Sequence, residues 1–167
     1  MAKNVIWGTV FALLAAIMQS TLLSRLAIYH AVPDLALGIL VFTAYVNGTM
    51  TGQLTGFFSG LLLDFLSASP LGLNAFIRTI IGATAGLMNG TFYLDNFFLP
   101  MALCAGATLG KALLFFVLHI LFAGAVPAYA LLSPIVWVEL LMNTLSAPLL
   151  FGLLKLFKQL LIGKRET

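Results

Sequence analysis

Residues 51–90 read TGQLTGFFSGLLLDFLSASPLGLNAFIRTIIGATAGLMNG, and the spacing of their glycines decides how the chain folds. Glycine recurs at every fourth position in each half of this stretch. The two sets are Gly52, Gly56 and Gly60, then Gly82, Gly86 and Gly90. Glycine at this spacing leaves a flat strip on a helix, where a second helix backbone can approach closely inside a bilayer. We therefore predict two tightly packed central helices, and the spacing leaves open whether their strips face each other.

A third pair of glycines with the same spacing lies further along the chain. Gly106 and Gly110 are four residues apart within an apolar stretch. By the same physical argument they predict a third close helix contact.

The composition places these helices in a membrane. Of the 167 residues, 62% are hydrophobic and 8% are charged, and the mean hydropathy is +1.11. A soluble domain of this size carries about 25% charged residues, so this chain could not cover its surface in water. The length allows one compact unit, and we predict an all-α bundle forming a single integral-membrane domain over residues 1–167.

Six apolar segments come close to the roughly 20 residues that a spanning helix needs. They are 4–23, 33–47, 51–66, 71–93, 97–122 and 134–157. Between the second and third, only Gly48-Thr49-Met50 offers a turn; without it, five spans remain and one terminus changes side. Ser69-Pro70 and Ser133-Pro134 each predict an N-cap followed by proline at the first helical position. Pro148 predicts a kink in the sixth span.

The distribution of basic residues orients the bundle. Lysine and arginine are enriched in cytoplasmic loops. Five of the eight basic residues lie near the chain ends: Lys3, Lys155, Lys158, Lys164 and Arg165. Of the opposite loops, near Ala31 and at 67–70 and 123–132, only the first holds a basic residue, Arg25. We predict that both termini are cytoplasmic, with basic side chains near membrane lipid. The net charge of +3 gives no nucleic-acid-binding stripe.

Four ionisable residues fall inside the apolar segments: Asp64, Arg78, Lys111 and Glu139. Each costs about 2.5–3.5 kcal/mol at a helix centre, so we expect them to converge and neutralise one another. Asn74 and Asn143 share helix faces with Arg78 and Glu139, respectively. A structural ion network is the leading interpretation, followed by a partner-docking pocket and then a proton or ion path. Arg78 could pair with Asp64 or with Glu139.

Residues suited to catalysis or metal binding are scarce. The two histidines, His30 and His119, are far apart in sequence, and Cys104 is the single cysteine, so neither a metal site nor an internal disulfide is expected. No nucleotide-binding glycine motif is present. Asp64 and Glu139 could form an acid–base pair, but nearby basic residues would neutralise them more simply. We predict a protein that is not an enzyme and has no cofactor.

Residues 60–75, GLLLDFLSASPLGLNA, carry a family resemblance. They resemble the best-marked region of the MreD family, in which a glycine-rich helix ends in an aspartate and a serine-containing turn leads to Pro-Leu-Gly. The turn residues here are Ser67, Ser69, Pro70 and Gly72. Pro33-Asp34 before the second helix, the length and the six-span plan also agree. Ala68 stands where that family usually has glycine.

The resemblance implies a non-catalytic scaffold in the bacterial inner membrane that maintains rod shape and organises peptidoglycan synthesis. It implies binding to MreC, and contact through that complex with MreB, RodA and a class B penicillin-binding protein. It also implies a fold similar to the substrate-binding subunits of energy-coupling-factor vitamin transporters. Such a subunit is the alternative function: Ala12 and Ala16 fit its partner-binding spacing, but the short turn at 67–70 counts against a ligand site.

Overall fold

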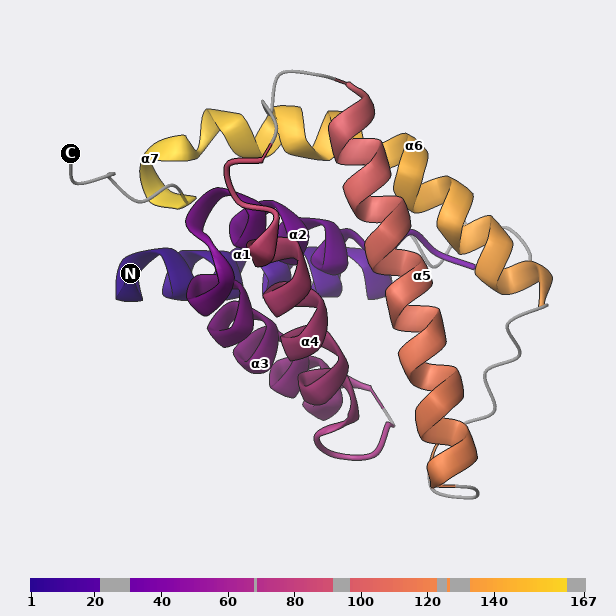
Figure 1. The fold of residues 1–167 in the computed structure, drawn as a ribbon. Coiled ribbons are helices and arrows are strands. Elements are labelled where there is room, and N and C mark those ends of the chain that lie inside the picture. Colours follow the sequence, from indigo (N-terminus) through magenta and orange to yellow (C-terminus); the bar gives the residue numbers. More distant parts are fainter. Residues whose placement is uncertain (22–30, 68, 92–96, 123–125, 127–132, 162–167) are drawn as a thin grey trace.

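The computed structural model describes residues 1–21, 31–67, 69–91, 97–122, 126 and 133–161. The described chain folds into helices and their connections (Figure 1), which confirms the all-α prediction. The helices are α1 (Ala2–Thr21), α2 (Leu35–Asn47), α3 (Thr49–Leu66), α4 (Leu73–Leu87), α5 (Phe98–Leu121), α6 (Pro134–Leu156) and α7 (Lys158–Leu161). The predictions that rest on Arg25, His30, Ala68, Lys164, Arg165 and most of 123–132 fall outside the described residues.

Three of the described helices, α1, α5 and α6, are long and apolar enough to cross a membrane. The first six helices coincide in position with the six predicted segments, and the sequence analysis missed only the four-residue α7. However, α2 has 13 residues and α4 has 15, below the roughly 20 of an ordinary span. The six-span topology therefore stays a prediction.

The short α2 is the centre of the core. Its residues from Leu40 to Ala44 have no exposed surface, and the Phe42 ring meets the Phe151 ring of α6 edge-on at 5.2 Å. The helix is apolar on all sides, which is typical of a helix surrounded by other helices. This burial explains why the segment can be so short, because α2 does not itself form the lipid-facing surface.

A glycine separates α2 from α3. Gly48 has a φ of +88°, a conformation that glycine adopts without steric cost, and its N–H donates to the carbonyl of Ala44 at 2.8 Å. α2 ends at Asn47 and α3 begins at Thr49. The predicted break between the two segments is therefore present at Gly48, although Thr49 and Met50, which were also predicted to form the turn, belong to α3.

The start of α4 differs from its prediction. The helix begins at Leu73 rather than directly after Ser69-Pro70, and its N-cap is Gly72, with a φ of +94°. Proline is therefore not the first helical residue, because the carboxylate of Asp64 binds the free N–H groups of this helix end instead. By contrast, the other predicted N-cap is confirmed: Ser133 caps α6, which starts at Pro134.

The end of α4 is also earlier than predicted. The helix ends at Leu87, and the next N–H groups bond three residues back, Met88 to Ala85 and Asn89 to Gly86, both at 3.2 Å. Gly90 follows in a turn with a φ of +76°. The assignment of Gly90 to the packing strip is therefore wrong, because the chain has left the helix before reaching it.

The remaining glycine strips pack directly on each other. A Cβ added at Gly52 would come within 3.0 Å of the Gly82 backbone, and one added at Gly56 within 3.0 Å of the Arg78 backbone. Gly60 is equally close to residues 74–75, and Gly86 to Thr49. Real Cβ atoms almost never approach so closely. The α3–α4 interface is thus a backbone-to-backbone contact, which resolves the question that the spacing left open.

The start of α1 and the last described helix, α7, meet at one end of the bundle, which we call the terminal end (Figure 1). Lys3 Nζ donates to the carbonyl of Gln159 at 3.1 Å. Asn4 Nδ2 donates to Asn47 Oδ1 at 2.7 Å, and Asn47 Nδ2 donates to the carbonyl of Leu161, also at 2.7 Å. These bonds join α1, the end of α2 and α7. The turn between α3 and α4 lies at the opposite end, the turn end.

Candidate functional site

The centre of the bundle contains an ion cluster made of Asp34, Arg78, Lys111 and Glu139. Arg78 Nη2 donates to both carboxylate oxygens of Asp34, at 2.8 and 3.0 Å. Lys111 Nζ donates to Asp34 Oδ2 at 2.9 Å and to Glu139 Oε1. Two acids and two bases make the cluster formally neutral. Mutual pairing of this kind is what allows charges to stay in an apolar interior.

Asp34 is the hub of this cluster, and sequence reasoning missed it. Its Oδ1 also accepts from the Leu37 N–H at 2.9 Å, so it caps α2 as well. Its own N–H donates to Asn143 Oδ1 at 2.7 Å, and Asn143 Nδ2 donates to Thr108 Oγ1 at 3.0 Å. The sequence did contain a weak signal, because Asp34 directly precedes the strongly apolar segment 35–46.

Asp64 does not belong to the ion cluster, contrary to the prediction. Its oxygens accept from the N–H groups of Gly72 and Asn74, both at 2.9 Å, and of Ala75 at 3.2 Å. A carboxylate is well placed at a helix N-terminus, where unpaired N–H groups and the helix dipole favour negative charge. The sequence analysis expected Arg78 to pair with Asp64 or with Glu139. Both pairings are wrong, because Arg78 forms its ion pair with Asp34.

The turn residues of the family motif gather around Asp64. Asn74 Nδ2 donates to Asp64 Oδ1 at 2.9 Å and to Ser69 Oγ at 3.0 Å, so Asn74 belongs to this turn and not to the ion cluster. Ser69 Oγ lies 3.4 Å from the same carboxylate oxygen and bonds Ser67 Oγ. Leu73 N–H donates to the carbonyl of Pro70 at 3.1 Å. The motif thus builds a cap for α4 at the turn end.

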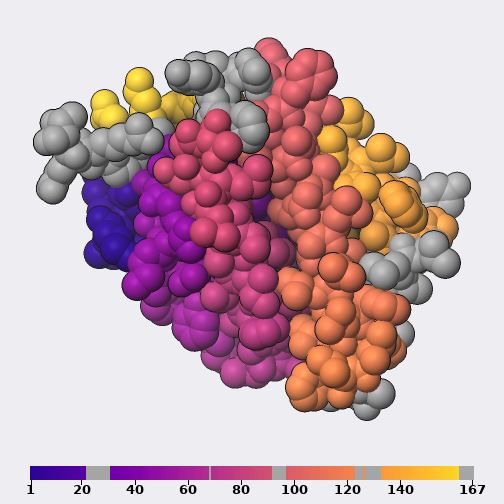
Figure 2. Space-filling view, viewed as in Figure 1, coloured from indigo at the N-terminus to yellow at the C-terminus, as the bar shows by residue number. Residues whose placement is uncertain are grey.

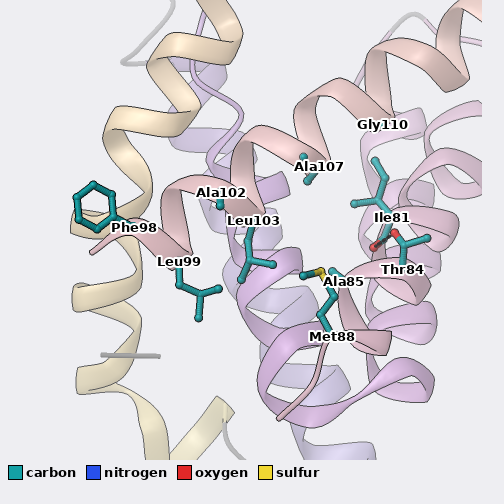
Figure 3. A pocket seen from close by; sticks show the side chains of 11 residues that line it. Ile81, Thr84, Ala85, Met88, Phe98, Leu99, Ala102, Leu103, Ala107 and Gly110 are labelled. Carbon is teal, nitrogen blue, oxygen red and sulfur yellow. Dashed lines mark hydrogen bonds between the residues drawn. The ribbon is translucent and has the colours of Figure 1, made fainter. Parts of the chain in front are cut away.

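A groove lies between α4 and α5, on the face shown in Figure 2, with a volume of about 620 Å³. In Figure 3, side chains of Ile81, Ala85 and Met88 from α4 line one side, with those of Leu103 and Ala107 from α5 opposite. The remaining lining residues are also uncharged: Thr84, Phe98, Leu99, Ala102, Gly106 and Gly110. On α4 the groove reaches Met88, and the next residue, Asn89, donates to the carbonyl of Tyr45 near the end of α2.

Gly106 and Gly110 lie in this groove and not in a helix contact. A Cβ added at either position would meet no atom within 4 Å. The predicted third close contact is therefore wrong, because α5 stands away from α4 along this stretch. The strip has the spacing of the α3–α4 strips but no helix of this chain covers it within the described residues.

Other predicted chemistry has a plain structural explanation. The ring nitrogen Nδ1 of His119 bonds the carbonyl of Val126 at 2.9 Å. Among the described residues, no three His, Cys, Asp or Glu side chains are grouped to hold a metal ion. Asp64 and Glu139 have separate roles, in the α4 cap and in the ion cluster.

A helical bundle with three membrane-length apolar helices and a neutralised ion cluster at its centre defines a helical membrane protein. Comparison with known protein families matches residues 1–159 to the rod shape-determining protein MreD. The chain belongs to the MreD family, which confirms the resemblance and supports a role in rod shape determination and a membrane location. No curated protein and no solved structure matches the chain. The vitamin-transporter alternative and the predicted similarity to that fold receive no support.

Proposed function

We propose that this protein is a non-catalytic scaffold of the cell-wall elongation machinery in the bacterial inner membrane. In this role it binds MreC, and through that complex it acts with MreB, RodA and a class B penicillin-binding protein to organise peptidoglycan synthesis. The observation that carries the proposal is the family match over residues 1–159, nearly the whole chain.

The geometry of the ion cluster supports a scaffold rather than a reactive centre. Asp34 precedes α2, Arg78 lies on α4, Lys111 on α5 and Glu139 on α6, so the cluster joins four parts of the bundle. Each of these side chains has an oppositely charged partner. Their mutual neutralisation fixes the relative positions of the helices, and the backbone contact of α3 with α4 adds a second rigid element.

The contact between the chain ends supports a topology with both termini on one side. Because Lys3 bonds Gln159, these two residues lie on the same side of the membrane in our proposal. The chain between them then crosses the membrane an even number of times. Lys3, Lys155 and Lys158 then mark the terminal end as cytoplasmic.

Cysteine labelling tests this topology, and the native Cys104 is buried. In intact cells, a membrane-impermeant thiol reagent should label Ser69→Cys. It should label Lys158→Cys only after the membrane is permeabilised. Labelling of Lys158→Cys in intact cells would contradict cytoplasmic termini.

Co-purification tests the partner. The protein, extracted in mild detergent, should retain MreC from the same organism and should not retain the energising subunits of vitamin transporters. Retention of an energising subunit without MreC would overturn the proposal in favour of a transporter subunit. Retention of neither would contradict MreC binding.

A further inference from the structure

At the terminal end, the fold brings together lysines from opposite ends of the chain. Lys3, in the first turn of α1, is exposed, and its Nζ donates to the carbonyl of Gln159 on α7 at 3.1 Å (Figure 1). The residue before Gln159 is Lys158, which is also exposed. An ammonium group has three donors, so the bond to Gln159 leaves two donors of Lys3 for another acceptor.

No described carboxylate balances these two lysines. The three acids that the structure describes are Asp34 and Glu139, in the ion cluster at the centre of the bundle, and Asp64, in the α4 cap at the turn end. Lys3 and Lys158 therefore present positive charge that the described part of the chain does not neutralise, and an anionic group would complement it.

A row of aromatic rings lies beside the lysines. The rings of Trp7 and Phe11 are 6.3 Å apart between centroids, and those of Phe11 and Phe157 are 5.2 Å apart. Trp7 follows Lys3 by one turn on the same face of α1, and Phe157 directly precedes Lys158. Trp7 is 37% exposed and Phe157 is 41% exposed. Partly exposed aromatic rings near helix ends are typical of the membrane interface, where one side of the ring meets acyl chains.

We propose that Lys3 and Lys158 bind the headgroup of an anionic phospholipid, whose acyl chains pack against the ring row Trp7, Phe11 and Phe157. This inference goes beyond the proposed scaffold function and does not depend on MreC.

The position of the two lysines favours a lipid over a soluble anion. Lys3 begins α1 and Lys158 follows the end of α6, and both helices are long and apolar enough to cross a membrane. Exposed apolar side chains accompany the lysines: Ile6 is 60% exposed and Leu156 is 76% exposed. A phosphate ion would cover the charges alone, whereas a phospholipid covers the charges and the apolar surface. In the proposed topology this end faces the cytoplasmic leaflet, whose surface potential is negative.

The site depends on the docking of α7. Leu161, at the end of α7, has no exposed surface, and its carbonyl accepts from Asn47 Nδ2 at 2.7 Å. This bond holds α7 against the end of α2 and so keeps Lys158 near Lys3. A lipid that binds both lysines should therefore stabilise the closed terminal end, because it binds the docked arrangement better than the open one.

Lipid binding to the purified full-length protein tests the role of the lysines. Native mass spectrometry compares phosphatidylglycerol with phosphatidylcholine of the same acyl chains, and the wild type should prefer phosphatidylglycerol. Lys158→Gln should weaken phosphatidylglycerol binding by about fivefold, the contribution of one lysine near anionic lipid, and the Lys3→Gln/Lys158→Gln variant by more than about tenfold. The matched control Lys158→Arg keeps the charge and should bind like the wild type. Both lysines are exposed, so these variants should fold normally.

Three results would overturn the lipid site. The first is equal binding of phosphatidylglycerol and phosphatidylcholine by the wild type. The second is unchanged phosphatidylglycerol binding by the double variant. The third is binding of inorganic phosphate as tight as that of phosphatidylglycerol, since the site would then take a soluble anion.

A change at Asn47 tests whether the lysines form one site. Asn47→Ala removes the bond to the Leu161 carbonyl but keeps every lysine, and it should lower the affinity for phosphatidylglycerol. The matched control is Asn89→Ala, which loses a bond to the carbonyl of Tyr45 near the end of α2 but leaves the bond to α7 intact, and it should bind like the wild type. Wild-type affinity in Asn47→Ala would show that the lysines act as separate surface charges, and would overturn the shared site.

Discussion

The two neighbours of α4 meet it in opposite ways. Towards α3, the glycines lie directly against backbone atoms of the facing helix, which leaves no room for a side chain. Towards α5, small residues line a groove of about 620 Å³. The connection from α3 to α4 is short and fixed by Asp64, whereas α5 is held by Lys111 in the ion cluster. Glycine spacing therefore marks a helix surface prepared for close contact, but it does not say which chain supplies the second helix.

The largest effect is expected where the backbones touch. Gly56→Leu would push its side chain into the backbone of Arg78, which cannot move without separating α3 from α4. We expect destabilisation of more than about 5 kcal/mol and little protein in the membrane. Membrane yield and thermal unfolding in detergent measure this, with Gly152→Leu on α6, which meets open space, as the control. Wild-type yield and stability for Gly56→Leu would contradict the packing described for this interface.

The next effect concerns the ion cluster, whose Lys111 holds α5 at the other side of α4. Arg78→Met removes one of the cations paired with Asp34 and should cost about 3–5 kcal/mol. Adding Asp34→Asn restores neutrality, leaving Lys111 with Glu139, and should recover part of that loss. Thermal unfolding of both single variants and of the double variant gives the interaction free energy between Arg78 and Asp34. Strictly additive losses would show that Arg78 and Asp34 do not pair.

A smaller effect is expected at the turn that fixes α3 to α4. Asp64→Asn keeps one acceptor oxygen for the N-terminus of α4 but removes the negative charge. We expect a loss of about 1–2 kcal/mol in unfolding free energy. Because Asp64 caps the helix and does not pair with Arg78, the loss should be the same in wild-type and Arg78→Met backgrounds. A clear dependence on the background would place Asp64 back in the ion cluster.

The smallest change adds a single methyl group at a glycine of α3 and at a glycine of α5, the two helices beside α4. Gly106→Ala meets open space and should change stability by less than about 1 kcal/mol, in the stabilising direction if anything, because alanine restricts the unfolded chain. Gly52→Ala places the same methyl against the Gly82 backbone and should be clearly destabilising. Equal unfolding temperatures for the two variants would contradict the difference between the tight α3–α4 contact and the open α4–α5 groove.

The sequence predicted the helices and the glycine strips because both depend on local spacing and composition. It could not predict that Asp34 is the hub of the ion cluster, since that role depends on how residues from four parts of the chain meet in space. The same applies to Gly106, whose environment depends on the course of α5. Asp64 shows a second reason: an apolar surrounding predicts that a carboxylate needs partners, but backbone N–H groups serve as well as cations.

The hydrogen bonds between the chain ends set a condition on biosynthesis. Asn4 bonds Asn47, and Asn47 bonds the carbonyl of Leu161, so this junction needs residues from the start and the end of the chain together. At about 5–20 residues per second, the ribosome takes roughly 8–30 s to pass from the first of these residues to the last. For most of that time α1 lacks its contact with α7. The closed bundle therefore forms only after the ribosome has made the last described helix, α7.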